Sequence, residues 1–176
     1  TQMADAARAA YADVREGILG LRVTPQGQRS FIETLTGYLE RWQGQSGVTV
    51  ALTTTPANAT IRLTPNAEVQ LLRIIQEALT NVRKHAGATT AEVRLQVENG
   101  WVEARILDNG TGFVPDDLAP RAAPRFGLST MQERADSIGG SLEIDSSPGE
   151  GTQVIARVPL DALPSRKEAS HARAHR

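Results

Sequence analysis

Apolar residues near the start of the chain recur at steps of three and four, the period of one face of an α-helix. This spacing predicts one helix over residues 2–23 and a second over 29–43. Pro25 and Gly27 lie in the "VTPQG" stretch between the two and predict a break there. The seam of the first helix suits a partner helix. Its members are Met3, Ala6, Ala10, Val14, Ile18 and Leu21.

Two short β-branched stretches follow, and then another helical pattern. The "VTVAL" stretch at 48–52 predicts a strand, and "TIRL" at 60–63 is a possible second strand. Thr64 or Asn66 could cap the next helix, and Pro65 suits its first turn. We expect this helix to reach about His85, before Gly87.

The remaining residues predict a hairpin, a loop, a helix and two further strands. Apolar and polar residues alternate from Ala91 to Leu107 on either side of Asn99-Gly100, which is a strong hairpin pattern. Three prolines without periodicity predict a loop at 114–126, and amphipathic spacing predicts a helix over 127–140. The strands are expected at 141–145 and 153–160, and the tail from Asp161 is expected to be disordered.

Composition narrows the class of protein. The chain has 176 residues, of which 40% are hydrophobic and 4% aromatic, so one core must be built mainly from aliphatic side chains. A net charge of −1 makes nucleic acid an unsuitable partner, and the absence of cysteine excludes disulfide scaffolds and thiolate metal sites. No apolar run could cross a bilayer, and no signal peptide is visible. Because the sequence starts at Thr1 within a helical pattern, we expect this chain to be a piece of a longer protein.

A polar stripe lies along the predicted helix that ends near His85. At 100° per residue, Asn81 falls about 40° and Lys84 about −20° from Glu77, so the three share one edge. The apolar face opposite contains Leu72, Ile75, Leu79 and Val82. Taken alone, this pattern is typical of a solvated helix face.

Three glycine-containing stretches could also carry chemistry. In "ILDNGTGF" (106–113) a strand delivers Asp108, which could accept a hydrogen bond from an exocyclic amine, and the glycines allow close backbone approach. An ordinary turn would give the same letters, whereas a calcium loop would need further acidic ligands. The "RFGLST" stretch (125–130) leads into a helix start, where phosphate could bind. By itself "GEGT" (149–152) is a hairpin turn.

Together these four motifs resemble, in order, the Bergerat ATP-binding fold of gyrase, histidine kinases and mismatch-repair ATPases. The stretches "RIIQEALTNVRKHAGAT" and "FGLSTMQERADSIGGSLEIDSSPGEGTQV" are similar to sensor histidine kinases of the nitrate-sensor type. The resemblance covers about residues 68–160. Upstream, "AARAAYADVREGILGLR" resembles the second dimerisation helix of that subfamily.

The resemblance implies a fold and a division of the chain. The fold would be a two-layer α/β sandwich, a mixed β-sheet with helices on one face, preceded by a partial dimerisation helix. Residues 1–24 would be the second helix of the dimerisation hairpin, 25–160 the catalytic ATP-binding domain and 161–176 a disordered tail.

The resemblance also assigns roles around ATP and Mg²⁺. Asn81 would bind Mg²⁺, which bridges the phosphates, and Glu77 would act as or orient the general base. Lys84 and His85 would lie near the phosphates. Asp108 would bind the adenine amino group. Thr152 would support that contact through a water, Gly110 and Gly112 would admit the ring, and 113–126 would form a lid. The remaining nucleotide-binding residues would be Phe113, Gly127, Leu128 and Ser129.

The implied function is the ATP-binding catalytic part of a bacterial two-component sensor histidine kinase. The γ-phosphoryl group would pass to a histidine upstream of this chain, whose own histidines are His85, His171 and His175. Implied partners are the upstream phosphoacceptor helix, a second copy in a homodimer, and a response regulator, without nucleic acid or direct membrane contact. The domain would be cytoplasmic, in a parent protein with or without an inner-membrane anchor. A sigma-factor-controlling serine kinase and a nucleotide-binding regulatory module without transfer activity are the alternatives.

Overall fold

A computed structural model describes residues 30–57, 59–114 and 124–161 of the chain. The helix expected over 2–23 and nearly all of the expected tail lie outside these residues, as does most of the expected lid. Asp161, where the tail was expected to begin, still donates its backbone N–H to the carbonyl of Arg62 at 2.9 Å.

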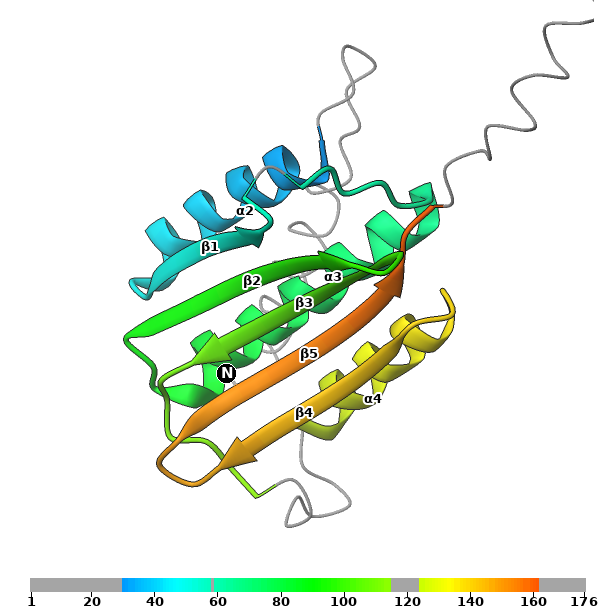
Figure 1. Cartoon of the computed structure of the whole chain (residues 1–176). Coiled ribbons are helices and arrows are strands. Elements are labelled where there is room, and N and C mark those ends of the chain that lie inside the picture. Colours follow the sequence, from blue (N-terminus) through cyan, green and yellow to red (C-terminus); the bar gives the residue numbers. More distant parts are fainter. Residues whose placement is uncertain (1–29, 58, 115–123, 162–176) are drawn as a thin grey trace, which may run out of the picture.

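The centre of the fold is one mixed five-stranded sheet in the order β1-β2-β3-β5-β4 (Figure 1). β1 is parallel to β2, and every other neighbouring pair is antiparallel. The strands are β1 (Thr49–Thr55), β2 (Thr90–Glu98), β3 (Trp101–Asp108), β4 (Ser141–Ser147) and β5 (Gly151–Pro159).

Helices cover one face of this sheet, which makes two layers (Figure 1). They are α2 (Phe31–Ser46), α3 (Pro65–Asn81) with the π-helical turn η1 (Val82–Ala86), and α4 (Pro124–Asp136). Their buried side chains form one core with the sheet. The predicted fold class, a two-layer α/β sandwich with a mixed sheet, is therefore confirmed.

Local sequence explains where the first two helices begin and end. Ser30 and Glu33 form a reciprocal capping box at the start of α2, and Gly47 ends that helix in a left-handed conformation. At α3, the Thr64 side chain accepts a hydrogen bond from the Ala67 N–H at 3.2 Å, and Pro65 occupies the first turn as predicted. The apolar face of α3 is fully buried, which fixes its rotation: Leu71, Ile74, Ile75 and Leu79 each have 0% exposure.

The β2–β3 hairpin determines where Asp108 lies. Asn99 and Gly100 both have positive φ values, 51° and 81°, as a two-residue hairpin turn requires, so the predicted hairpin is confirmed. Side chains alternate across β3, and Val102, Ala104 and Ile106 are buried toward the helices. Asp108, the last residue of the strand, continues this series, so its carboxylate lies on the core face of the sheet.

Three sequence predictions differ from the structure. Residues 60–63 form no strand: Ile61 and Leu63 do pack on the core, but the segment has no strand partner among the described residues. The helix that reaches His85 is regular only to Asn81, and its last turn is π-helical. The last described helix spans 124–136 rather than 127–140, and residues 137–139 form a turn.

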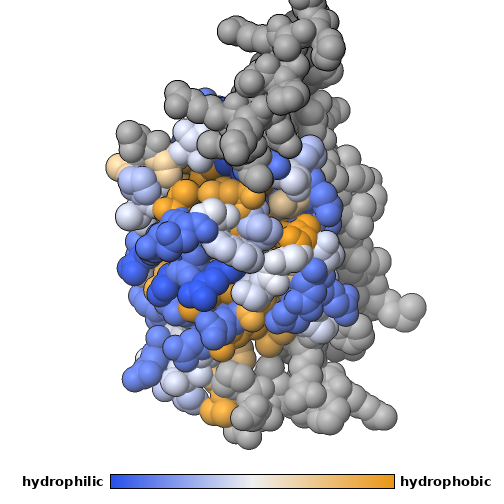
Figure 2. Space-filling model, turned by 45° about the vertical axis from the view of Figure 1, so that its right-hand side comes forward, coloured by the Kyte–Doolittle hydropathy of each residue, from blue (hydrophilic) through white to orange (hydrophobic). Residues whose placement is uncertain are grey.

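None of the described helices covers the other face of the sheet, which is mainly polar. Glu103 lies between two arginines, accepting from Arg105 Nε at 2.5 Å and Arg157 Nε at 2.6 Å, and Arg94 pairs with Glu92. Trp101, at 43% exposure, is the largest exposed apolar side chain among the described residues. Figure 2 shows hydrophilic side chains interspersed with apolar ones on the face turned toward the viewer. Such charged ladders keep an open sheet face soluble.

Candidate functional site

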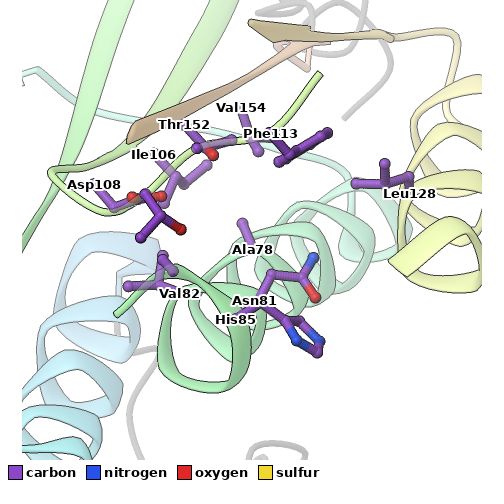
Figure 3. Close-up of a pocket in the computed structure, with 13 residues that line it drawn as sticks. Ala78, Asn81, Val82, His85, Ile106, Asp108, Phe113, Leu128, Thr152 and Val154 are labelled. Carbon is purple, nitrogen blue, oxygen red and sulfur yellow. The ribbon is translucent and has the colours of Figure 1, made fainter. Parts of the chain in front are cut away.

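A pocket lies between the end of α3, the carboxyl end of β3 and the start of β5 (Figure 3). It brings together segments that are far apart in the sequence. Each of the four motifs contributes at least one lining residue, and the GEGT stretch contributes Thr152 alone. The lining residues are Ala78, Asn81, Val82, His85, Ala86, Ile106, Asp108, Thr111, Gly112, Phe113, Leu128, Thr152 and Val154.

Asp108 is the acidic group of this pocket, and it is half-buried. Its Oδ1 accepts a hydrogen bond from the Gly110 N–H at 2.8 Å, and its register partner across the sheet is Thr152. Burial raises the pKa of the Asp108 carboxyl, while hydrogen bonds from the Gly110 and Thr152 backbone oppose that rise. The carboxylate also lines the pocket, so it can accept a further hydrogen bond from a ligand that supplies a donor.

The two glycines after Asp108 are needed for packing. A Cβ atom on Gly110 would collide with the Ala86 carbonyl, which also accepts from the Thr111 N–H at 2.8 Å. Gly112 has a φ of 59°, and a Cβ there would collide with the Ser147 carbonyl. The loop is therefore pressed between η1 and the β4–β5 turn. Whether these glycines also admit the ring of a ligand stays a prediction.

Asn109 holds this loop to the start of β2, a role that sequence reasoning missed. Its Oδ1 accepts from the N–H groups of Thr89 and Thr90, both at 3.0 Å, and its Nδ2 donates to Thr89 Oγ1 at 2.9 Å. An Asn in a turn was the available signal. The turn interpretation was correct about the residue type but did not reveal the long-range partner.

The polar edge of α3 is not simply solvated. Glu77 and Asn81 are half-buried, and both lie beside Gly127 of α4: a Cβ on Gly127 would collide with Glu77 Oε1 and lie 3.6 Å from Asn81 Nδ2. The predicted neighbours Glu77 and Asn81 are thus brought together against the start of α4.

The remaining predicted site residues are placed unevenly. His85 is exposed and lines the pocket, and Figure 3 shows it beside Asn81. Lys84 is exposed in the π-helical turn and is not among the lining residues. On α4, Leu128 lines the pocket whereas Ser129 is exposed outside it. Because α4 begins at Pro124, the free N–H groups of its first turn start before Gly127.

Ser146 is a further polar residue of the site, and sequence reasoning missed it. It is 9% exposed, and its hydroxyl contacts the Phe113 N–H, the Gly151 carbonyl and the Thr152 hydroxyl, each at 3.0 Å. The alternation of Leu142 and Ile144 could have revealed it, since the next core-facing position of that strand is 146.

The residues present fit a metal held jointly with a phosphate ligand. Within the described part of the chain, no group of three His, Cys, Asp or Glu could hold a metal ion by itself. The Asn81 side chain lines the pocket next to the Glu77 carboxylate, which provides oxygen atoms of the kind that Mg²⁺ prefers. A cation here would need most of its ligands from phosphate and water, as is usual for Mg²⁺.

Comparison with known proteins gives a consistent result. The family model described as "Histidine kinase-, DNA gyrase B-, and HSP90-like ATPase" matches residues 66–162. The sensor histidine kinase LiaS of Bacillus subtilis is 40% identical over 98 residues, which cover 56% of this chain and 26% of that protein. DegS of Brevibacillus brevis, a signal transduction histidine-protein kinase/phosphatase, is 31% identical over 153 residues, or 87% of this chain and 38% of that protein. The chain thus spans well under half the length of these relatives.

Solved structures show the same fold. The histidine kinase domain of the Erythrobacter litoralis EL346 blue-light activated histidine kinase superposes with a TM-score of 0.64 at 17% identity, covering 82% of this chain and 70% of that one. The mycobacterial sensor histidine kinase MprB gives 0.61 at 20% identity, covering 77% and 97%. Among the described residues, no helix combines the length and apolar character that crossing a membrane requires.

Proposed function

This chain belongs to the histidine kinase-, DNA gyrase B- and HSP90-like ATPase family. From that premise we propose that it binds the ATP whose γ-phosphoryl group passes to a histidine in a sensor kinase. The observation that carries the proposal is the pocket itself. The Asp108 carboxylate lies at one end, and Asn81 lines the pocket toward the start of α4, next to Glu77, which lies outside the lining beside Gly127. The two ends suit a base and a metal-bound phosphate respectively.

At the base end, Asp108 accepts a hydrogen bond from the exocyclic amine of adenine. The Gly110 N–H holds Oδ1 in place, so the carboxylate is oriented before the ligand arrives. Thr152, the register partner of Asp108, lines the same part of the pocket and supports this contact, as the family resemblance implies. Ile106 and Val154 provide apolar surface for the ring.

At the phosphate end, Asn81 would hold Mg²⁺ through its side-chain oxygen, with His85 next to it on the pocket wall. The ion, when bound, neutralises phosphate charge during transfer. Glu77 would act as, or orient, the general base for the attacking histidine, because its carboxylate is adjacent to Asn81 and faces Gly127. Lys84 and Ser129 are exposed near this end and would contact phosphate only if the ligand reaches beyond the pocket.

The rest of the transfer machinery would lie elsewhere in a longer protein. We infer an upstream phosphoacceptor helix, a homodimer and a response regulator as partners, and kinship with the nitrate-sensor type. The relatives named above support this inference because they are sensor kinases much longer than this chain. The chain would then be a cytoplasmic ATP-binding unit that acts on a helix held next to it.

The test combines binding with transfer. Calorimetry with ADP and Mg²⁺ should detect binding to this chain. The full-length parent protein with labelled ATP should form a phosphoprotein that is labile in acid, as phosphohistidine is, and an Asp108→Asn version should form much less. Acid-stable label on Ser or Thr would favour the serine-kinase alternative. Binding without any transfer would favour a regulatory module.

A further inference from the structure

We propose that Ser146 is a specificity-determining positioning residue, because it fixes the Thr152 hydroxyl as a hydrogen-bond acceptor toward the base. The inference rests on the proposed function and extends it from Asp108 to the hydroxyl beside it. It concerns the 6-position of a purine, where adenine carries an amino group and hypoxanthine a carbonyl.

Ser146 presents a buried hydroxyl on the core face of β4. It has three partners at 3.0 Å: the Phe113 N–H, the Gly151 carbonyl and the Thr152 hydroxyl. A serine hydroxyl has one proton to donate and two lone pairs that accept. Three partners therefore use its full capacity.

The direction of each bond follows by elimination. The Phe113 N–H can only donate, so it occupies one lone pair of Ser146. The Gly151 carbonyl can only accept, so it takes the single proton of Ser146. The one remaining place on Ser146 is a lone pair. The Thr152 hydroxyl must therefore donate its proton to Ser146, and this assignment satisfies all three contacts at once.

This direction decides what Thr152 offers to a ligand. With its only proton committed to Ser146, Thr152 has lone pairs alone for the pocket that it lines. Figure 3 shows Thr152 and Asp108 on the same side of this pocket. The Asp108 carboxylate also accepts hydrogen bonds, and so Asp108 and Thr152 both present acceptors to the pocket.

Two acceptors select a donor. A 6-amino group, or a water that donates to Thr152, pairs with them. A 6-oxo group brings a third acceptor, which leaves buried polar atoms unpaired. A site that leaves such atoms unpaired discriminates strongly against the wrong ligand. Ser146 thus acts on the base through Thr152, without touching the base.

Ser146 also connects two segments of the site. Its bond to the Phe113 N–H joins the loop after β3 to β4, and the Gly149 N–H of the β4–β5 turn donates to the Thr111 carbonyl of the same loop at 2.7 Å. Removing the hydroxyl should therefore lower stability as well as change selectivity. Affinity alone is an ambiguous readout, and the ratio of two affinities is the informative one.

The experiment compares ADP with inosine diphosphate, whose bases differ at the 6-position and in the proton that hypoxanthine carries on N1. Calorimetry on this chain should show tighter binding of ADP. Ser146→Ala should lower the Kd ratio of inosine diphosphate to ADP by about tenfold, because the freed Thr152 hydroxyl can turn its proton toward a 6-oxo group. Ser147→Ala is the matched control: Ser147 is the exposed neighbour on the same strand, and the ratio should not change.

Thr152→Val gives a second, independent variant of nearly equal shape. It should lower the ratio while Ser146 is intact, and adding Ser146→Ala to it should lower the ratio no further. An unchanged ratio in Ser146→Ala, with only a lower melting temperature, would overturn the proposal. If Ser146→Ala does not fold, an unchanged ratio in Thr152→Val would overturn it instead. Failure of the wild-type chain to bind either nucleotide would refute the proposed function itself.

Discussion

Replacing Asp108 by Asn should separate nucleotide affinity from folding stability. The Gly110 N–H donates to Oδ1 at 2.8 Å and needs an acceptor, so an Asn here would keep its carbonyl oxygen at that position. Its Nδ2 would then replace the second carboxylate oxygen. An adenine amine would meet an N–H donor in place of a charged acceptor.

The size of the loss follows from the bond that disappears. A hydrogen bond to a charged acceptor contributes about 1.5–3 kcal/mol. This corresponds to a Kd for ADP that is about 10- to 100-fold higher. Mismatched donors add to this loss, whereas partial solvation of the half-buried site reduces it, and we expect a value within this range.

Folding stability should respond in the opposite direction. Because burial raises the folded-state pKa of Asp108, its carboxyl favours folding while protonated, and that contribution disappears as the pH rises through the folded-state pKa. At pH 7 the charged form therefore costs stability, and a neutral Asn does not. The melting temperature of Asp108→Asn should equal or exceed that of wild type at pH 7, and the difference should shrink in acid.

Calorimetry with ADP and a thermal melt of the unliganded chain test both halves. Glu103→Gln, on the open face of the sheet, serves as a control for loss of one acidic side chain elsewhere. Two results would refute the reasoning: an unchanged Kd for ADP, or a melting temperature that falls together with the affinity. The second would mean that Asp108 is a structural residue whose loss opens the pocket.

Five other substitutions test the rest of the site. Asn81→Ala should remove the Mg²⁺ dependence of ADP binding in titrations with and without EDTA. Glu77→Gln in the full-length protein should leave binding intact and slow transfer about 100-fold in single-turnover assays. Equal losses of affinity in the two variants would show that the roles are misassigned. Gly127→Ala should slow transfer similarly, with little change in melting temperature, because its Cβ would displace the Glu77 carboxylate. Asn109→Ala should lower stability by about 0.5–1.5 kcal/mol in urea titrations because it removes the exposed anchor of the loop. An unchanged midpoint would contradict that role. Gly112→Ala should abolish the folded circular dichroism signal at 37 °C, since its φ of 59° and the Ser147 carbonyl both oppose a side chain.

Sequence patterns predicted the elements whose signal is local. The Asn99-Gly100 hairpin followed from turn chemistry, and the start of α3 followed from Thr64 and Pro65. The strand at 60–63 was wrong because alternating apolar residues occur equally in an extended segment that has no partner strand. The π-helical turn after Asn81 escaped prediction because its extra residue alters the apolar spacing over only one turn.

The sequence pointed to several residues that line the pocket but not to their contacts. Family resemblance singled out Asp108, Asn81 and Thr152, and the structure places all three on one pocket. The long-range partners of Ser146 and Asn109 could not be predicted, because they depend on which segments the folded sheet brings together. Composition and spacing along the chain do not specify those distances.

The attachment of β1 has a consequence for how the domain opens. β1 is an edge strand that pairs with β2 alone, and neither β1 nor α2 contributes a residue to the pocket lining. We predict that the two open together as a subglobal unit while β2, β3 and β5 keep the nucleotide site assembled. Nucleotide that binds only the assembled site would have no differential affinity for such an opening and would not suppress it. In amide hydrogen exchange, ADP should therefore protect η1 and the end of β3 strongly, while α2 exchanges at nearly the same rate with and without ligand.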